Sequence, residues 1–285
     1  MLFLSLLLPF LGAANGVLGT SPELFLSFLS KDNAGKWQLK NLENSFVKVT
    51  DRLYMAETEV TNQQYNYYLN DLLERKDFTT LMVVKAEKTE WRQLIPEKYR
   101  NLGDKVYFPY RFPDDKDYPA QNMTHEGAVK FCEWLTHFYN NDNVDKRKWK
   151  KVVFRLPTED EWMAAARGKN GTAVKYPWGH DKPQNAKGCF LSNFNSFEVD
   201  CPTCKVFDDV TKDGGFFTVK ADAYFPNDYG LYGMVGNVAE MIATSGVAKG
   251  GSWEDIPSEC TIQSQKKYTN PSPAIGFRVL MEIIE

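Results

Sequence analysis

The stretch NDYGLYGMVGNVAEMIATSGVAKGGSW, residues 227–253, decides the fold of this chain. It begins with turn-forming residues, passes through a short apolar run to a Gly-Asn pair at 236–237, and ends in a Gly-Gly-Ser-Trp run at 250–253. Glycines this dense among aromatic residues indicate backbone that bends tightly against large side chains. The stretch therefore predicts neither a plain helix nor a plain strand, and Glu240 stands just past its central turn.

The composition of the whole chain is that of an ordinary soluble globule. Of its 285 residues, 43% are hydrophobic and 25% are charged. Lys and Arg number 34 against 37 Asp and Glu, so the formal net charge is −3. This balance gives no reason to expect nucleic acid or an anionic membrane as a partner. Because aromatic residues reach 14%, we expect a core filled with rings.

The N-terminus has the pattern of an export signal. Residues 1–14, MLFLSLLLPFLGAA, form an apolar run that ends in small residues and is too short to span a bilayer. We predict a signal peptide over 1–19, cleaved after Ala14 or Gly19, then an extension over 20–42 and no membrane span after signal removal. The start carries no Lys or Arg, which leaves a buried hydrophobic segment as the alternative.

Capping patterns predict three helices ahead of residue 170. Thr61 with Gln64, and Thr158 with Glu161, have the spacing of capping boxes, and another helix follows Thr124. The apolar stripes expected to face the core are Tyr65, Tyr68, Leu69, Leu72 and Leu73; Ala128, Phe131, Cys132 and Leu135; and Trp162, Ala165 and Ala166. The carboxylates at 159–161 suit a helix start, which explains them without catalysis.

The remaining segments predict short strands and loops. Residues 45–60 alternate over part of their length and are interpreted as strands, whereas 76–117 are interpreted as loops and short pieces. No long periodic segment follows residue 170. The pattern predicts a loop-rich α+β domain.

Six motifs, in one order, resemble the formylglycine-generating enzyme family, also called sulfatase-modifying factor. They are ETEVTNQQY (57–65), RLPTEDEWMAAARG (155–168), YPWG (176–179), GLYGMVGNVAEM (230–241), KGGSW (249–253) and GFRVL (276–280). The resemblance covers residues 43–285 and implies a single domain with a variant of the C-type lectin fold. It is stronger grounds for the fold than for the chemistry.

The resemblance implies a first calcium site. Its ligands would be the side chains of Asn193 and Asp213 and the backbone carbonyls of Phe194 and Gly215. Hard, mostly neutral oxygen donors in a loop are what calcium accepts. The alternative is that the Asn and Asp side chains make turn hydrogen bonds.

A second calcium site of the family is weakened or lost. The resemblance would assign to it the carbonyls of Gly236 and Val238 and the side chain of Glu240. The family's further side-chain ligand falls at Gly233, which has no side chain to offer. Glu240 is then free to accept backbone hydrogen bonds instead.

The five cysteines are an odd number, so at least one thiol is unpaired or paired between chains. Cys132 is expected in the core as a small hydrophobic residue. Cys201 and Cys204 form a lone CxxC, and we predict a structural disulfide within that pair or from one of them to Cys189. A redox pair and half of a zinc site are the alternatives.

The family's active site departs most from its pattern here. The oxidase uses two cysteines to hold copper(I), and the matching positions are Asp255 and Cys260. Aspartate is a hard ligand and cannot replace a thiolate in such a site. Ser252 matches the family's active-site serine, but Ala239 and Ala274 stand where the family has Trp and Asn, and its arginine-rich stretch holds lysines.

These departures favour a non-catalytic binding or assembly module, secreted, periplasmic or in the cell envelope, with a protein partner of the envelope or secretory pathway. One alternative is a copper-dependent oxidase that converts a sulfatase cysteine to formylglycine through Cys260, and copper(I) is expected only in that case. Another is a lectin-like ligand binder that uses the 76–117 loops. His125, His137 and His180 lack the HxxxHxE spacing of the superfamily's iron enzymes.

Overall fold

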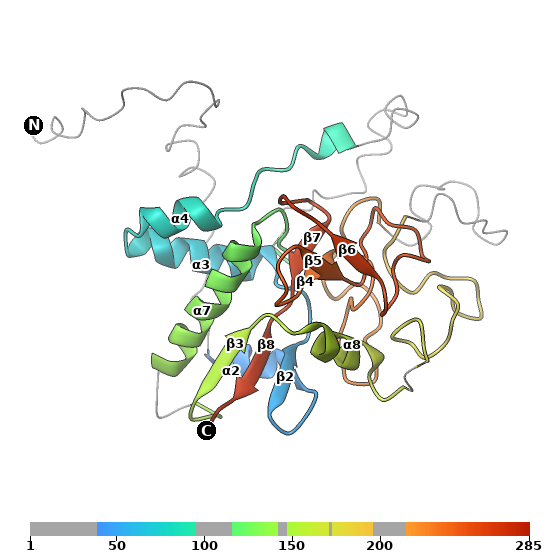
Figure 1. Cartoon of the computed structure of the whole chain (residues 1–285), viewed down its shortest axis with the longest axis horizontal. Coiled ribbons are helices and arrows are strands. Elements are labelled where there is room, and N and C mark those ends of the chain that lie inside the picture. Colours follow the sequence, from blue (N-terminus) through green and yellow to red (C-terminus); the bar gives the residue numbers. More distant parts are fainter. Residues whose placement is uncertain (1–38, 95–115, 142–146, 171–172, 196–214) are drawn as a thin grey trace, which may run out of the picture. The chain divides into compact units, whose positions relative to one another are not determined.

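Two short-stranded sheets and a group of helices make up the described part of the chain (Figure 1). The computed structural model describes residues 39–94, 116–141, 147–170, 173–195 and 215–285, all within the unit Ala34–Glu285. The predicted signal peptide lies outside these ranges. Among the described residues, none of the helices combines the length and apolar character that crossing a bilayer would require.

The first sheet is antiparallel throughout, in the order β1-β2-β8-β3. Its strands are β1 (Phe46–Lys48), β2 (Leu53–Ala56), β3 (Val152–Arg155) and β8 (Leu280–Ile283). The C-terminal strand β8 thus lies between β2, from the start of the domain, and β3, from its middle, which joins the two ends of the domain. Met55 is paired with Leu280 in this register, and both are buried.

The three predicted helices are confirmed as α3 (Asn62–Glu74), α7 (His125–Asn141) and α8 (Glu159–Arg167). Both capping boxes form: each threonine hydroxyl accepts from the backbone N–H three residues on, and that residue's side chain accepts in return. Helix α7 runs beside the first sheet (Figure 1), where the Thr136 hydroxyl accepts a 2.8 Å hydrogen bond from the Phe154 backbone N–H of β3.

Further helical segments lie at α2 (Leu39–Asn44), α4 (Phe78–Val84) and the 3-10 turn η1 (Trp91–Leu94). Helix α4 falls in the stretch interpreted as loops and short pieces. Its β-branched residues weaken the helical signal in the sequence. Packing decides the outcome, because Leu81 and Val84 are buried and the Val84 carbonyl accepts a 2.6 Å bond from the Tyr65 hydroxyl.

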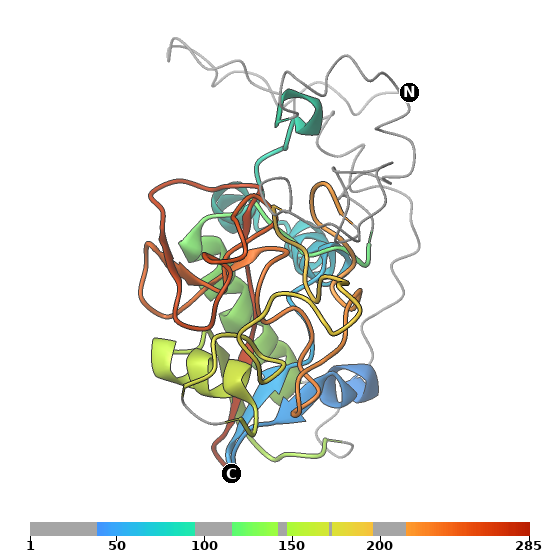
Figure 2. The same cartoon turned by 90° about the vertical axis from the view of Figure 1, so that its right-hand side faces the viewer.

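The second sheet carries the glycine-rich motifs, in the order β6-β5-β4-β7. Its strands are β4 (Ala239–Met241), β5 (Val247–Lys249), β6 (Gln265–Lys267) and β7 (Ile275–Phe277), and β4 runs parallel to β7. The turn at 236–237 is confirmed, since both of its residues have positive φ, 74° and 58°. Figure 2 shows the loop-rich segments 173–195 and 215–236 running side by side near this sheet.

Candidate functional site

A cluster of polar and charged residues surrounds Asp255, the first of the two positions that the resemblance assigns to the family's cysteines. The backbone N–H and hydroxyl of Ser252 both donate to Asp255 Oδ2, at 2.9 and 2.6 Å. Strand β6 places Lys266 opposite Ala248 of β5, and its Nζ lies 2.8 Å from each Asp255 carboxylate oxygen. The same ammonium is 2.6 Å from Glu254 Oε1. We call Ser252, Glu254, Asp255 and Lys266 the Asp255–Lys266 cluster.

The electrostatics of this cluster keep Lys266 charged. Burial works against the charge on Lys266, but hydrogen bonds to Asp255 and Glu254 outweigh it, and the net effect raises the pKa of the ammonium. A lysine that stays protonated cannot act as a general base. Ser252 is fully buried, and its hydroxyl proton is already committed to Asp255. The cluster therefore forms a partly exposed ion pair, and its buried serine hydroxyl is not a free nucleophile.

Cys260 is buried beside this cluster. Its side chain is fully buried and packs with Phe190 and Phe194, and its Sγ lies 3.5 Å from the Ser252 carbonyl oxygen. Burial raises the pKa of the thiol well above its ordinary value, and the negative charge of Asp255 raises it further. Because copper(I) needs soft thiolates, a protonated thiol next to an ammonium-bound carboxylate does not fit that ion.

The other cysteines do not complete a thiol pair in the described structure. Cys132 is a buried free thiol in α7, as predicted, and burial raises its pKa. Cys189 is a free, exposed thiol whose backbone N–H donates to Asn185 Oδ1 at 3.0 Å. Cys201 and Cys204 lie outside the described residues, so a disulfide within that pair stays a prediction.

The first calcium position has one feature that suits a cation. Asn193 is fully buried, and its Oδ1 has no hydrogen-bond partner, whereas its Nδ2 donates to the Phe217 carbonyl at 2.7 Å. Gly215 is adjacent, since a Cβ on it would lie 2.8 Å from that orphan oxygen. Phe194 is buried beside Asn193, and Asp213 lies outside the described residues. An unpaired buried oxygen next to a predicted ligand position is compatible with calcium.

The second calcium position is organised differently from the expectation. The Glu240 carboxylate accepts its hydrogen bonds from the side chains of Arg278 and Trp162, and not from backbone N–H groups as expected. Arg278 Nε donates to its two oxygens at 3.0 and 3.1 Å, Arg278 Nη2 donates to Oε1 at 2.7 Å, and Trp162 Nε1 donates to Oε2 at 2.6 Å. All of these side chains are almost fully buried. Sequence reasoning missed Arg278 and Trp162 as partners, although both lie within motifs that carry the resemblance.

Glu59 is a further buried carboxylate that sequence reasoning did not single out. Its Oε1 accepts a 2.9 Å hydrogen bond from Asn237 Nδ2, whereas its Oε2 has no hydrogen-bond partner and lies 3.9 Å from Arg278 Nη2. Burial raises the pKa of Glu59 to about 8, against the opposing effect of Arg278 and with a smaller contribution from Glu240. Desolvation outweighs the attraction of the guanidinium because Glu240 already shares that positive charge.

This shift predicts a pH-dependent stability. The folded chain keeps a proton on Glu59 that the unfolded chain releases near its ordinary pKa of 4.5, so this contribution is complete below that pH and is lost as pH rises through about 8. We expect the free energy of unfolding to fall between these limits, by up to about 1.4 kcal/mol per pH unit. Urea unfolding across this range should show Glu59→Gln removing most of the slope.

The control for this prediction is Glu126→Gln, which removes an exposed carboxylate on α7. That variant should keep the slope of the wild type. If Glu59→Gln also kept it, Glu59 would not be the group that holds the proton.

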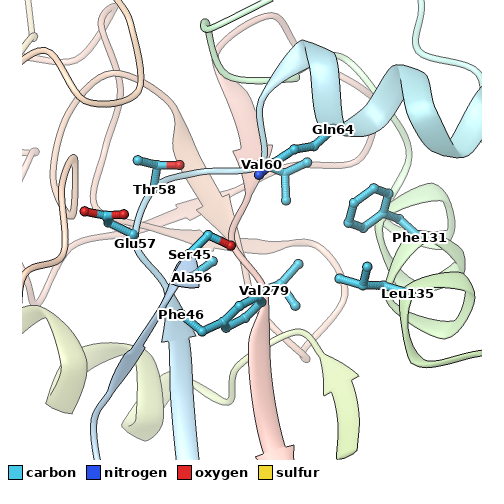
Figure 3. A pocket seen from close by; sticks show the side chains of 10 residues that line it. All are labelled: Ser45, Phe46, Ala56, Glu57, Thr58, Val60, Gln64, Phe131, Leu135 and Val279. Atoms are coloured by element: carbon cyan, nitrogen blue, oxygen red, sulfur yellow. The ribbon is translucent and has the colours of Figure 1, made fainter. Parts of the chain in front are cut away.

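A small pocket between the first sheet and α7 does not offer an alternative ligand site. Figure 3 shows the side chains around it, with Phe131 and Leu135 of α7 facing Phe46 and Val279. Its volume is about 20 Å³. That is room for about one water molecule, not for an organic ligand.

Comparison with known proteins identifies the family. The model of the sulfatase-modifying factor enzyme 1-like domain matches residues 32–283, and the chain belongs to this family. Formylglycine-generating enzyme of Mus musculus is 26% identical over 279 residues, covering 80% of this chain and 65% of the relative. Inactive C-alpha-formylglycine-generating enzyme 2 of Mus musculus is 34% identical over 220 residues, covering 73% and 59%. The chain thus spans less than two thirds of the length of either relative.

Solved structures confirm the predicted fold. PvdO of Pseudomonas aeruginosa matches with a TM-score of 0.52 at 18% identity, over 81% of this chain and 80% of that chain. CarF matches with a TM-score of 0.50 at 23% identity, over 82% of this chain and 87% of that chain. At these identities the likeness concerns the fold and not the chemistry.

Proposed function

We propose that this chain is a non-catalytic binding or assembly module, exported to a secretory compartment or cell envelope, that acts through a protein partner. The observation that carries the proposal is the Asp255–Lys266 cluster. Where the family's oxidase holds copper(I) between two thiolates, this chain holds a carboxylate neutralised by an ammonium. The remaining thiol, Cys260, is buried and stays protonated because its pKa is raised.

Two further departures from the family's pattern lie side by side where β4 meets the start of β7, and they support the same proposal. Ala239 and Ala274 stand where the resemblance implies Trp and Asn, and the Ala239 backbone N–H donates to the Ala274 carbonyl at 2.9 Å. Both residues are fully buried. The large and polar side chains that the oxidase carries at these neighbouring positions are thus replaced by methyl groups within one hydrogen-bonded pair.

The names of two relatives are compatible with this role. The Mus musculus relative and one from Bos taurus, which is 36% identical over 148 residues, are both named inactive C-alpha-formylglycine-generating enzyme 2. Other members of this family are therefore named as lacking the oxidase reaction. Export of this chain rests on the apolar N-terminus and stays part of the proposal.

The exposed side of α4 favours a protein partner over the lectin-like alternative. Phe78 and Met82 are one helical turn apart and are 56% and 62% exposed. Apolar side chains presented on a helix suit contact with another protein surface better than hydrogen bonding to a sugar. The lectin-like reading would instead need polar groups and rings arranged around a groove.

Calcium belongs to the proposal as a structural ion at the first position. Asn193 Oδ1 and the adjacent Gly215 would contribute, together with Phe194 and Asp213. Calcium there would give the unpaired oxygen of Asn193 a partner and tie two loops together. Because an ion that binds only the folded state raises its stability, EDTA should lower the melting temperature of the protein as purified.

Turnover is the direct test. Reduced full-length chain, copper(I), oxygen and a sulfatase-type cysteine peptide would be mixed, and the peptide examined for aldehyde by mass spectrometry, with mouse formylglycine-generating enzyme in parallel. We expect no aldehyde. In the same preparation, a thiol reagent should label Cys189 at once but Cys132 and Cys260 only after unfolding. Aldehyde that disappears in Cys260→Ser would overturn the proposal.

A further inference from the structure

We propose that a groove at one end of the first sheet binds a segment of a partner protein that carries both an acidic and a basic side chain. The groove lies between the β1–β2 turn, the first turn of α8 and β8, and its volume is about 470 Å³. None of the residues that line it belongs to the Asp255–Lys266 cluster. The inference rests on the proposed function, because it names a contact surface for the protein partner.

The groove follows from the register of the first sheet. Leu53 pairs with Glu282 of β8, and Arg155 lies on the same face of the sheet, two residues along β3 from the residue that pairs with Glu282. Further along this face, Met55 is buried against Trp162 of α8. Helix α8 therefore covers the sheet there, and the face stays open around Leu53. A cleft of this volume is large enough to hold a ligand.

One carboxylate in the groove is only partly neutralised. Arg155 donates to both oxygens of Glu161, at 2.7 and 2.8 Å, and twice to Glu282 Oε2, at 3.1 and 3.3 Å. The hydrogen bonds from Arg155 lower the pKa of Glu161 to about 2, so Glu161 stays charged. One guanidinium thus faces two carboxylates. Because no hydrogen bond to Glu282 Oε1 is found within the described ranges, that oxygen can accept from a cation.

Arg52 supplies the opposite charge. Its Nε donates to the Ile283 carbonyl at 3.1 Å, which holds the guanidinium beside the residue that follows Glu282. In the described part of the chain, neither Nη1 nor Nη2 of Arg52 has an acceptor, and the neighbouring Asp51 pairs with Lys48 at 2.9 Å instead. The open edge of a guanidinium suits a carboxylate, which can accept two parallel hydrogen bonds from it. The groove therefore offers one position for an anion and one for a cation.

These two positions select the kind of segment that can bind. Glu282 repels a segment with only acidic side chains, and Arg52 repels one with only basic side chains. In an extended chain, side chains two residues apart lie on the same face. An acidic and a basic residue with that spacing can therefore face the groove together. Because the charged groups of the groove are partly exposed, we expect a short peptide to bind weakly.

The test is a titration of the full chain with the synthetic peptide acetyl-Ser-Glu-Ser-Lys-Ser-amide, followed by backbone amide shifts in NMR spectra. We expect saturable shifts at residues 50–53 and 282–283, and binding that is about tenfold weaker in Arg52→Gln because a bidentate contact is lost. Arg75→Gln is the matched control, since Arg75 is also exposed but does not line the groove. That variant should bind like the wild type.

Reversing the charge gives a second test that loss of folding cannot imitate. Arg52→Glu should prefer the peptide with lysine at both charged positions, whereas the wild type should prefer the mixed peptide. The absence of saturable shifts in the groove, or equal binding by Arg52→Gln and the wild type, would overturn the proposal. Aldehyde in the turnover assay would instead overturn the non-catalytic function and leave these shifts unchanged, so the two failures are distinguishable.

Discussion

Replacing Asp255 by cysteine should convert a chain that does not retain copper(I) into one that does. The substitution puts a second soft ligand five residues before Cys260, the spacing that the resemblance implies for the oxidase. Cys260 Sγ is already 3.7 Å from the backbone oxygen of residue 255 and 3.5 Å from that of Ser252, so the remaining thiol lies close to the substituted residue. The Lys266 ammonium, now 2.8 Å from the carboxylate, would favour the new thiolate.

Copper retention is measured by competition with a chromophoric copper(I) chelator under anaerobic, reducing conditions. We expect about one copper per chain in Asp255→Cys and none in the wild type, because only the variant offers two thiolates. Asp255→Ser is the matched control, since it removes the carboxylate without adding a thiol, and Asp255→Cys combined with Cys260→Ser removes the partner. Copper held equally by the wild type would contradict the assignment of Asp255 as the vacant position.

Arg278→Leu should be the most destabilising single substitution proposed here, with a loss of about 3–5 kcal/mol in the free energy of unfolding. The reason is that Glu240, 1% exposed, would keep a buried charge without its counter-ion. The carbonyls of Ala56, Glu57 and Tyr232 would each lose one hydrogen bond at the same time. A change of this size is measured by urea unfolding, as a shift of the midpoint at an unchanged slope.

Arg155→Leu is the matched control for this effect. Arg155 also pairs with two carboxylates, Glu161 and Glu282, but its side chain is 30% exposed. Water can solvate those carboxylates after the substitution, so the expected loss is about 1 kcal/mol or less. Combining Arg278→Leu with Glu240→Gln should recover part of the stability, because the double variant no longer buries an unpaired carboxylate at this position. Equal losses for the two arginines would show that burial does not set the cost.

The features that could be predicted from the sequence are those that neighbouring residues determine. Thr61 and Thr158 begin their helices because each capping partner is three residues away. The turn at 236–237 follows from a Gly-Asn pair that tolerates positive φ. The family and its fold follow from motif order, and the aspartate at 255 predicts the loss of the copper site.

The tertiary structure alone determines that α4 is a helix and which charged side chains contact Asp255 and Glu240. Lys266 reaches Asp255 because β6 pairs with β5, a register that no local pattern encodes. Glu59 and Arg278 meet Glu240 because β8 returns beside β2 and β7 runs parallel to β4. Burial then determines their chemistry, since the same carboxylates in water would be ordinary acids. The sequence by itself therefore determined which catalytic group is absent, whereas only the tertiary structure decided which groups took its place.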